Sequence, residues 1–138
     1  MQELAVTYSI GEVAEKFGLS IPTIRYYDKE GLIPNLQKNT AGVRRFSEDN
    51  IGTLKLIECL KNAGMPIKDI KQFIQWTLLG DETLDERYQM FQELRISVQK
   101  QMKQMQETLD TVNFKCAYYQ KATEDGTEKF VKDEMHLE

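Results

Sequence analysis

The apolar residues between positions 1 and 80 recur three and four apart in short segments, which is the spacing of amphipathic helices. Ser9 and Glu12 have the spacing of a capping box and begin the first helix. Gly18 ends this helix, because glycine readily takes the left-handed conformation of a C-terminal cap. Ser20 then caps a second helix, which the pattern predicts at 21–29.

Two more helices are predicted after a break. Ser47 caps a helix at 48–62, and Pro66 begins another that ends just before Gly80. The residues predicted to be buried by the last of these helices are Ile67, Ile70, Phe73, Ile74 and Leu78.

The segment 32–46 does not follow a helical pattern. Gly31 closes the second helix, and Pro34 prevents its resumption. The residues Asn39 to Gly42 form an obvious turn sequence between two short extended arms. The pattern therefore predicts a β-hairpin.

A long helix follows, because no proline or glycine occurs between Thr83 and Gly126. Thr83 and Glu86 have capping-box spacing, and a helix of roughly 35 to 40 residues would be about 50 to 60 Å long. Its apolar residues alternate four and three apart, with Arg95 as the single polar interruption. This predicted seam consists of Leu84, Tyr88, Phe91, Val98, Met102, Met105, Leu109, Val112, Cys116 and Tyr119.

Such a stripe is too long to be covered by a domain of this size, so the same helix of a second chain is its expected partner. The alternative is that the helix folds back on its own domain. Residues 123–138 are mostly polar and charged, with Phe130 and Val131 as their one apolar pair, and are predicted to form a tail or a weak final turn. The chain is thus expected to be mostly α-helical, with regions at 1–80, 81–122 and 123–138.

The balance of charge differs between the two parts of the chain. Residues 1–80 carry 10 Lys and Arg against 9 Asp and Glu, whereas residues 81–138 carry 8 against 13, within a net charge of −4. This total argues against a generally adhesive nucleic-acid binder, and the asymmetry suggests two tasks. An apolar run of transmembrane length and an export leader are both lacking, which predicts a cytoplasmic protein without a membrane partner.

Residues for metal or nucleophilic chemistry are scarce. Cys59 and Cys116 lack the paired spacing of zinc or redox motifs, so a disulfide framework is not expected. His136 is the single histidine and lies in the predicted tail, where it has no nucleophile beside it. The sequence therefore predicts a protein that is not an enzyme and holds no metal or cofactor.

Two short helices joined by a glycine-containing turn match a helix-turn-helix, whose second helix enters the major groove of DNA. The residues predicted to contact DNA from that helix are Ser20, Thr23, Arg25, Tyr26 and Tyr27. Arginine can bind guanine or phosphate with its fork of donors, and hydroxyl groups donate to phosphate oxygens. The alternative for the tyrosines is a place in the core, with one of the two packed inward.

The hairpin offers a second cationic surface. Lys38 precedes its turn, and Arg44 and Arg45 follow it. Because side chains alternate along a strand, the two arginines point to opposite sides and one of them is predicted to reach DNA.

The stretch YSIGEVAEKFGLSIPTIRYYDKEGLIPNLQKNTAGVRRFSEDNI, followed by GMPIKDIKQFI, closely resembles the N-terminal signature of MerR-family transcriptional regulators. The resemblance covers residues 8 to about 80 and includes the G-x-R-R-F wing. It implies a winged helix-turn-helix domain followed by a long dimerising helix in an antiparallel coiled coil. It also implies binding to inverted repeats in double-stranded promoter DNA, distortion of that DNA under control of a small effector, and RNA polymerase as a partner at the promoter.

The same resemblance narrows the effector. Metal-sensing members carry cysteines at the start of the long helix and after it, which this chain lacks, and the short tail cannot enclose a drug-sized ligand. The stretch LIECLKNAGMPI is similar to the aldehyde- and nitrosothiol-responsive subgroup, in which a lone cysteine occupies the position of Cys59. Cys59 is expected at the edge of its helix's buried face, where Lys55 favours the reactive thiolate.

Three alternatives remain open at this point. Cys59 can be a small core residue, which is the usual role of a helical cysteine. The effector can instead bind reversibly near Phe91, Trp76 or Tyr88. The chain can also be an interaction module that uses its coiled coil to bind another protein and does not read DNA.

Overall fold

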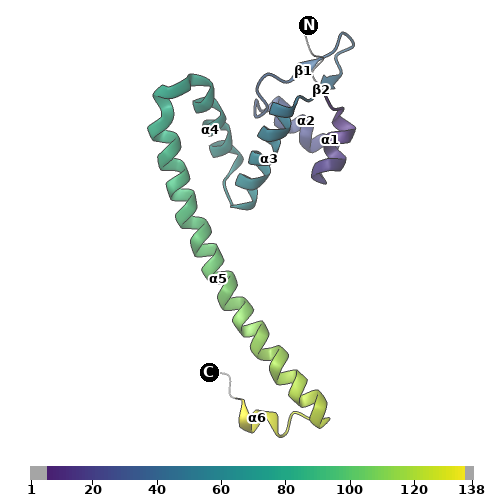
Figure 1. Cartoon of the computed structure of the whole chain (residues 1–138), viewed down its shortest axis with the longest axis vertical. Coiled ribbons are helices and arrows are strands. Elements are labelled where there is room, and N and C mark those ends of the chain that lie inside the picture. The colour runs from purple at the N-terminus through teal and green to yellow at the C-terminus, as the bar shows by residue number, and fades with distance from the viewer. Residues whose placement is uncertain (1–5, 136–138) are drawn as a thin grey trace. The chain divides into compact units, whose positions relative to one another are not determined.

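The computed structural model describes residues 6–135, so the prediction that His136 has no nucleophile beside it lies outside the described residues (Figure 1). The chain divides into two units, Met1–Leu94 and Arg95–Glu138. Its elements, in order, are α1 (Ile10–Phe17), α2 (Ile21–Lys29), β1 (Gln37–Lys38), β2 (Arg44–Arg45), α3 (Glu48–Asn62), α4 (Ile67–Leu79), the 3-10 helix η1 (Gly80–Thr83), α5 (Leu84–Asp125) and α6 (Val131–Glu134).

The first two helices begin and end at the predicted signals. The backbone N–H of Glu12 donates to Ser9 Oγ and the N–H of Ser9 donates to Glu12 Oε1, both at 3.1 Å, which completes the capping box. Gly18 takes the left-handed conformation with φ 64°, and Ser20 Oγ accepts the N–H of Thr23 at 3.2 Å. The tight turn between α1 and α2 therefore follows from local caps.

The hairpin also forms where it was predicted. Gln37 pairs with Arg45 and Lys38 pairs with Arg44 in antiparallel register. Asn39 Oδ1 accepts the N–H groups of Ala41 and Val43, each at 3.0 Å, which fixes the turn. The wing is thus a short ribbon whose paired residues include three cations, Lys38, Arg44 and Arg45.

The core of the first unit lies between α1, α2, α3 and α4, which gather on one side of the hairpin (Figure 1). Its most deeply buried side chains include Ile24, Leu32, Phe46, Leu54, Ile57, Leu60 and Ile70. Of the residues predicted to be buried on α4, Leu78 is 63% exposed, so that prediction was wrong. The core face of α4 ends at Phe73 and Ile74, and η1 follows directly after Leu79.

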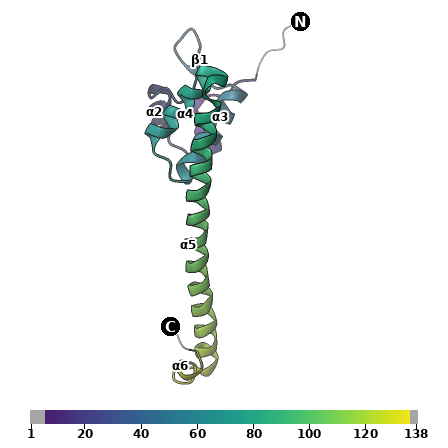
Figure 2. The ribbon, with the colours of Figure 1, turned by 90° about the vertical axis from the view of Figure 1, so that its left-hand side faces the viewer.

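The long helix α5 is one continuous helix of 42 residues, slightly longer than the sequence suggested (Figure 2). The predicted capping box at Thr83 is absent, because the Thr83 hydroxyl donates to the carbonyls of Trp76 at 2.6 Å and Gly80 at 3.0 Å. Arg87 Nε in turn donates to Thr83 Oγ1 at 3.1 Å. Contacts with α4 and η1 therefore hold the start of α5 in place of a local cap.

The end of the second unit is more ordered than a polar tail. Gly126 takes φ 72° and turns the chain, and the N–H of Thr127 donates to the carbonyl of Ala122 at 3.1 Å. The side chain of Val131 on α6 is fully buried against Tyr118 and Ala122, whereas Phe130 stays 54% exposed. The final turn therefore has a small core of its own. No helix within residues 6–135 is both long and apolar enough to cross a membrane.

Candidate nucleic-acid interface

A surface groove of about 610 Å³ brings part of α2 together with the hairpin. Four of its residues come from the predicted DNA-contacting set: Arg25 and Tyr26 on α2, and Lys38 and Arg44 on the hairpin. The other lining residues are Pro22, Asp28 and Lys29. Four cationic side chains and one carboxylate line this groove, which gives it the charge expected of a surface for polyanions.

Asp28 ties the hairpin to α2. Arg44 Nε donates to Asp28 Oδ2 at 2.7 Å, and Lys38 Nζ lies 3.9 Å from the same oxygen. Lys38 and Arg44 are cross-strand partners, and like charges in that position repel each other, so the carboxylate offsets their repulsion. The sequence interpretation missed Asp28, although it is the only acidic residue between Glu15 and Glu30.

Arg25 and Tyr26 are exposed, and Tyr26 is 47% accessible. The guanidinium of Arg25 makes no hydrogen bond or ion pair with any residue of the described range 6–135. A cation that is exposed at a groove and unengaged within the chain is available for a phosphate or a base edge.

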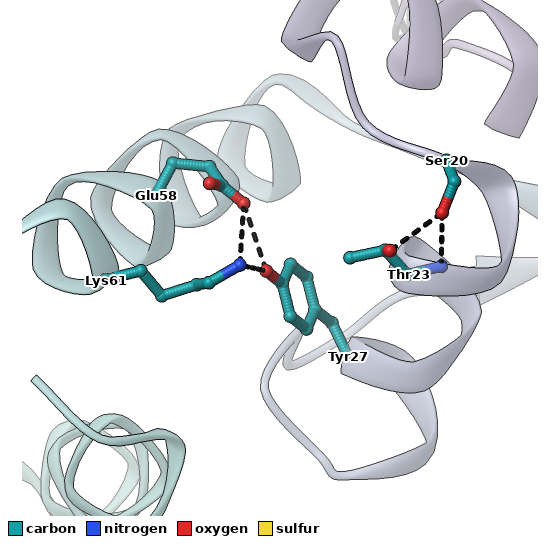
Figure 3. A network of polar contacts seen from close by, with 5 residues as sticks. All are labelled: Ser20, Thr23, Tyr27, Glu58 and Lys61. Carbon is teal, nitrogen blue, oxygen red and sulfur yellow. Dashed lines mark hydrogen bonds and ion pairs between the residues drawn. The ribbon is translucent and has the colours of Figure 1, made fainter.

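Ser20 and Thr23 lie at the N-terminus of α2, and their hydroxyl oxygens are 2.7 Å apart (Figure 3). Ser20 is exposed and Thr23 is half-buried. The Ser20 hydroxyl caps α2 and shares a hydrogen bond with the Thr23 hydroxyl, so both lie next to the N–H groups that favour an anion.

Tyr27 differs from its neighbour because its side chain is only 1% exposed. Its ring points from α2 toward α3, where Lys61 Nζ donates to the phenol oxygen at 2.5 Å and the phenol donates to Glu58 Oε1 at 3.1 Å (Figure 3). Burial raises the pKa of the Tyr27 phenol, and the hydrogen bond with Tyr27 raises the pKa of Lys61. One of the two adjacent tyrosines therefore packs inward, and the sequence did not reveal its partners on α3.

The two arginines of β2 diverge, as the alternation of a strand requires. Arg44 lines the groove, whereas Arg45 Nε donates to Thr7 Oγ1 at 3.1 Å and Arg45 Nη2 donates to the carbonyl of Thr7 at 3.2 Å. Arg45 therefore fastens the N-terminal segment to the wing.

A second, smaller groove of about 520 Å³ lies between α2 and α4 and shares Tyr26 with the first. Its other lining residues are Glu30, Ile67, Lys68, Lys71, Gln72 and Gln75. Lys71 Nζ lies 3.8 Å from a carboxylate oxygen of Glu30, while Lys68 is exposed. Polar surface thus continues beyond the first groove along α4.

The helical pattern predicts that Cys59 lies at the edge of the buried face, and it is an exposed residue of α3. Lys55 lies one turn earlier and is also exposed. Cys116 is likewise exposed on α5.

Most of the predicted seam is uncovered within the described chain. Met102 and Met105 are 67% and 68% exposed, Leu109 and Val112 are 47% and 50% exposed, and these four residues line an apolar groove of about 400 Å³ on α5.

The other seam residues differ in exposure. Leu84, Tyr88 and Tyr119 are each more than half exposed, whereas Val98 is half-buried. Phe91 is partly covered by its own unit. Its ring packs edge-on against Phe73 in the core, with the two ring centres 5.2 Å apart.

Residues 8–76 match the family described as MerR HTH family regulatory protein, and residues 51–113 match the family described as MerR, DNA binding. An HTH-type transcriptional regulator of Haemophilus influenzae is 43% identical over 126 residues, which span 91% of this chain and 93% of that protein. The structure of HiNmlR, a MerR family regulator lacking the sensor domain, bound to promoter DNA, is 43% identical and has a TM-score of 0.82 over 90% of this chain and 98% of that chain. A MerR family transcriptional regulator from Bacillus thuringiensis is 42% identical and has a TM-score of 0.73 over 81% of this chain and 98% of that chain.

Proposed function

This chain belongs to the MerR family of helix-turn-helix regulatory proteins, and from that premise we propose that it is a homodimeric transcriptional regulator that binds an inverted repeat in promoter DNA. The observation that carries the proposal is the cationic groove in which Arg25 and Tyr26 lie beside Lys38 and Arg44. A relative of known structure, HiNmlR, is described as bound to promoter DNA, which supports the same ligand here.

The groove suggests a division of labour on the duplex. α2 enters the major groove, where Arg25 binds a guanine edge or a phosphate and Tyr26 donates its hydroxyl to the backbone. Ser20 and Thr23 place the N-terminus of α2 against a phosphate. Lys38 and Arg44 contact the flanking backbone from the wing, and Arg45 supports the wing through Thr7.

Binding is tested by the salt dependence of affinity, because each cation that neutralises a phosphate releases counterions. Arg25→Ala and Arg44→Ala are expected to weaken binding to a promoter duplex. Each is also expected to reduce the slope of log Kd against the logarithm of the salt concentration by about one. Lys103→Ala removes an exposed cation from α5 and serves as the matched control. If all three variants bind the promoter duplex with the same affinity and the same salt dependence, a coiled-coil interaction module that does not read DNA becomes the better hypothesis.

The proposed assembly is a dimer formed through α5. Residues 1–80 supply the DNA-binding domain, residues 81–122 pair with the same helix of a second chain in an antiparallel coiled coil, and residues 123–138 form a short C-terminal tail. The exposed apolar stripe from Met102 to Val112 supports this arrangement, since pairing removes it from water. A two-fold dimer holds two copies of α2 for the two halves of an inverted repeat.

Regulation is proposed to act on DNA shape. Bending or untwisting a promoter takes a few kcal/mol, and a bound effector that shifts this energy alters how RNA polymerase engages the site. The repressor or activator remains on the DNA in both states under this scheme.

Cys59 is proposed as the point at which an electrophilic effector acts. Its exposure supports attack by its thiolate on an α,β-unsaturated aldehyde, because the thiolate is the nucleophilic form of cysteine. A bond forms between Sγ and the β carbon, the carbon–carbon double bond is consumed, and a proton from solvent is taken up at the α carbon.

Intact-mass measurement after exposure to such an aldehyde tests this step. The unaltered chain and Cys116→Ala are expected to carry an adduct that Cys59→Ala does not gain at the same aldehyde concentration. If the aldehyde instead changes the DNA binding of Cys59→Ala as much as that of the unaltered chain, and neither gains mass, sensing is reversible. A site near Phe91, Trp76 or Tyr88 then becomes the better hypothesis.

A further inference from the structure

Tyr27 lies in the last turn of α2, and its side chain is turned away from solvent. Its ring is buried in the core of the first unit, and its hydroxyl reaches the rim of that core, where the side chains of Lys61 and Glu58 are 36% and 22% exposed. Lys61 Nζ also lies 5.2 Å from the centre of the Tyr27 ring. The residue therefore joins α2 to α3 through both packing and polar contacts (Figure 3).

The hydrogen bonds of this triad have a fixed direction. Lys61 donates to the phenol oxygen at 2.5 Å, which leaves the phenol proton to be donated to Glu58 Oε1 at 3.1 Å. Lys61 Nζ also lies 3.8 Å from Glu58 Oε1, so these two residues of α3 form an ion pair. Because a cation, a neutral phenol and a carboxylate follow one another, each hydrogen bond is charge-assisted and holds the hydroxyl at one position.

The neighbouring residues show what this position controls. Tyr26 and Tyr27 are adjacent, with ring centres 6.2 Å apart, and Asp28 follows with its hydrogen bond to the wing arginine Arg44 at 2.7 Å. The last turn of α2 is thus held on one side by α3 and on the other by the wing. A rotation of α2 about its axis would move the exposed side chains of Arg25 and Tyr26 relative to the hairpin cations.

We propose that Tyr27, Lys61 and Glu58 form a positioning triad that sets the rotation of α2 for DNA recognition without touching DNA. This inference rests on the proposed function as a DNA reader. It separates the two tyrosines: Tyr26 contacts the duplex, whereas Tyr27 acts through α3. Binding surfaces need their side chains held within roughly 0.5 Å and 10–20°, which hydrogen bonds to a neighbouring helix supply better than apolar packing alone.

The phenol is the group to remove, because Tyr27→Phe keeps the buried ring and the net charge and deletes only the hydrogen bonds. Lys61→Met deletes the donor from the other side, and Lys61→Arg keeps a donor at the same place. Tyr8→Phe is the matched control, since the Tyr8 hydroxyl donates to Glu48 at 2.5 Å in the same unit but not from α2. Affinity is measured with the duplex that the unaltered chain enriches most from random DNA, and with a scrambled duplex of equal composition.

All affinities are taken well below the melting temperature of each variant, so that a change in stability alone does not alter them. Tyr27→Phe and Lys61→Met are expected to weaken binding to the enriched duplex about five- to tenfold. This is less than the effect of a charge-assisted hydrogen bond lost at the interface itself, because the triad acts on DNA only through the placement of α2. Tyr27→Phe leaves binding to the scrambled duplex unchanged. Lys61→Arg is expected to keep most of the affinity that Lys61→Met loses. Combining Tyr27→Phe with Lys61→Met adds little further loss, because both substitutions break the same triad.

Two results would overturn the inference. If Tyr27→Phe binds the enriched duplex as tightly as Tyr8→Phe while Arg25→Ala binds weakly, the triad only stabilises the fold and the DNA-reading function stands. If the unaltered chain enriches no duplex at all, the proposed function is wrong and the positioning role is wrong with it.

Discussion

Leu109 offers a quantitative test of the proposed dimer. It lies in the apolar groove on α5 and is 47% exposed in the single chain, so pairing of two helices has about half of its side chain left to bury. Full burial of a leucine side chain is worth about 1.5–3 kcal/mol, so the part gained on pairing is about 1 kcal/mol for each chain. The dimer therefore gains about 2 kcal/mol from its two copies of Leu109.

This magnitude predicts a graded response. Leu109→Ala is expected to weaken dimerisation about thirtyfold, since about 1.4 kcal/mol corresponds to a factor of ten in Kd. Leu109→Asp also brings a carboxylate from each chain into an apolar seam, and a further loss of about 2 kcal/mol makes the total effect about a thousandfold. DNA affinity falls in parallel, because a single chain reads only half of an inverted repeat.

Sedimentation equilibrium over a range of protein concentrations measures the dimer Kd directly. Ile96→Asp is the control, because Ile96 is 67% exposed on the same helix but lies outside the 3.5-residue seam. The control is expected to change the dimer Kd by less than about twofold, as is usual for surface substitutions. If Leu109→Asp and Ile96→Asp dimerise equally well, α5 does not pair through this seam and the reasoning fails.

The remaining predictions concern the wing, the C-terminal turn and the first helix. Asp28→Asn releases Arg44 and is expected to destabilise the fold by about 1 kcal/mol in thermal unfolding and to reduce the preference for the enriched over the scrambled duplex, whereas unchanged preference would show that the wing needs no tether. Val131→Ala is expected to speed hydrogen exchange of the amides at 126–135 while leaving the first unit's exchange unchanged, because Val131 is the fully buried residue of α6. The hydrogen bond from the Ser9 backbone lowers the pKa of Glu12 below its ordinary 4.5, so the stability this cap contributes is present above that pH and is lost as pH falls through the lowered value. Glu12→Gln should remove this acid sensitivity of the melting temperature. Identical acid melting profiles of Glu12→Gln and the unaltered chain would contradict this prediction.

The helix boundaries were accessible from the sequence because caps are local. Ser20, Ser47 and Gly18 act on backbone groups three or four residues away, so their effect does not depend on the rest of the fold. The hairpin was predictable for the same reason, since the turn from Asn39 to Gly42 supplies its own hydrogen bonds.

Predictions that depend on tertiary contacts were less secure. Leu78 continues the apolar spacing of α4 but extends beyond the core, and Thr83 had a local capping partner yet bonds to carbonyls of the preceding elements. Spacing alone describes neither the end of a core nor the path of a neighbouring segment. Both departures occur where α4, η1 and α5 meet.

The candidate site shows the same division. The pattern identified the cations on α2 and the hairpin, but adjacent tyrosines on a short helix are only about 100° apart, so the spacing did not decide which one packs inward. Asp28 and Lys61 gain their roles from residues that are distant in the sequence, Arg44 and Tyr27 respectively. Such pairs become visible only once the elements are placed in space.

Selection of bound fragments from a random duplex library, carried out with the full chain, measures whether two copies of this chain read one DNA site together. We expect enrichment of one inverted repeat whose two halves are related by a dyad, and loss of that enrichment with Leu109→Asp, because both would follow from dimeric reading of the site. Recovery of a single asymmetric half-site, or of no preferred sequence, would contradict it.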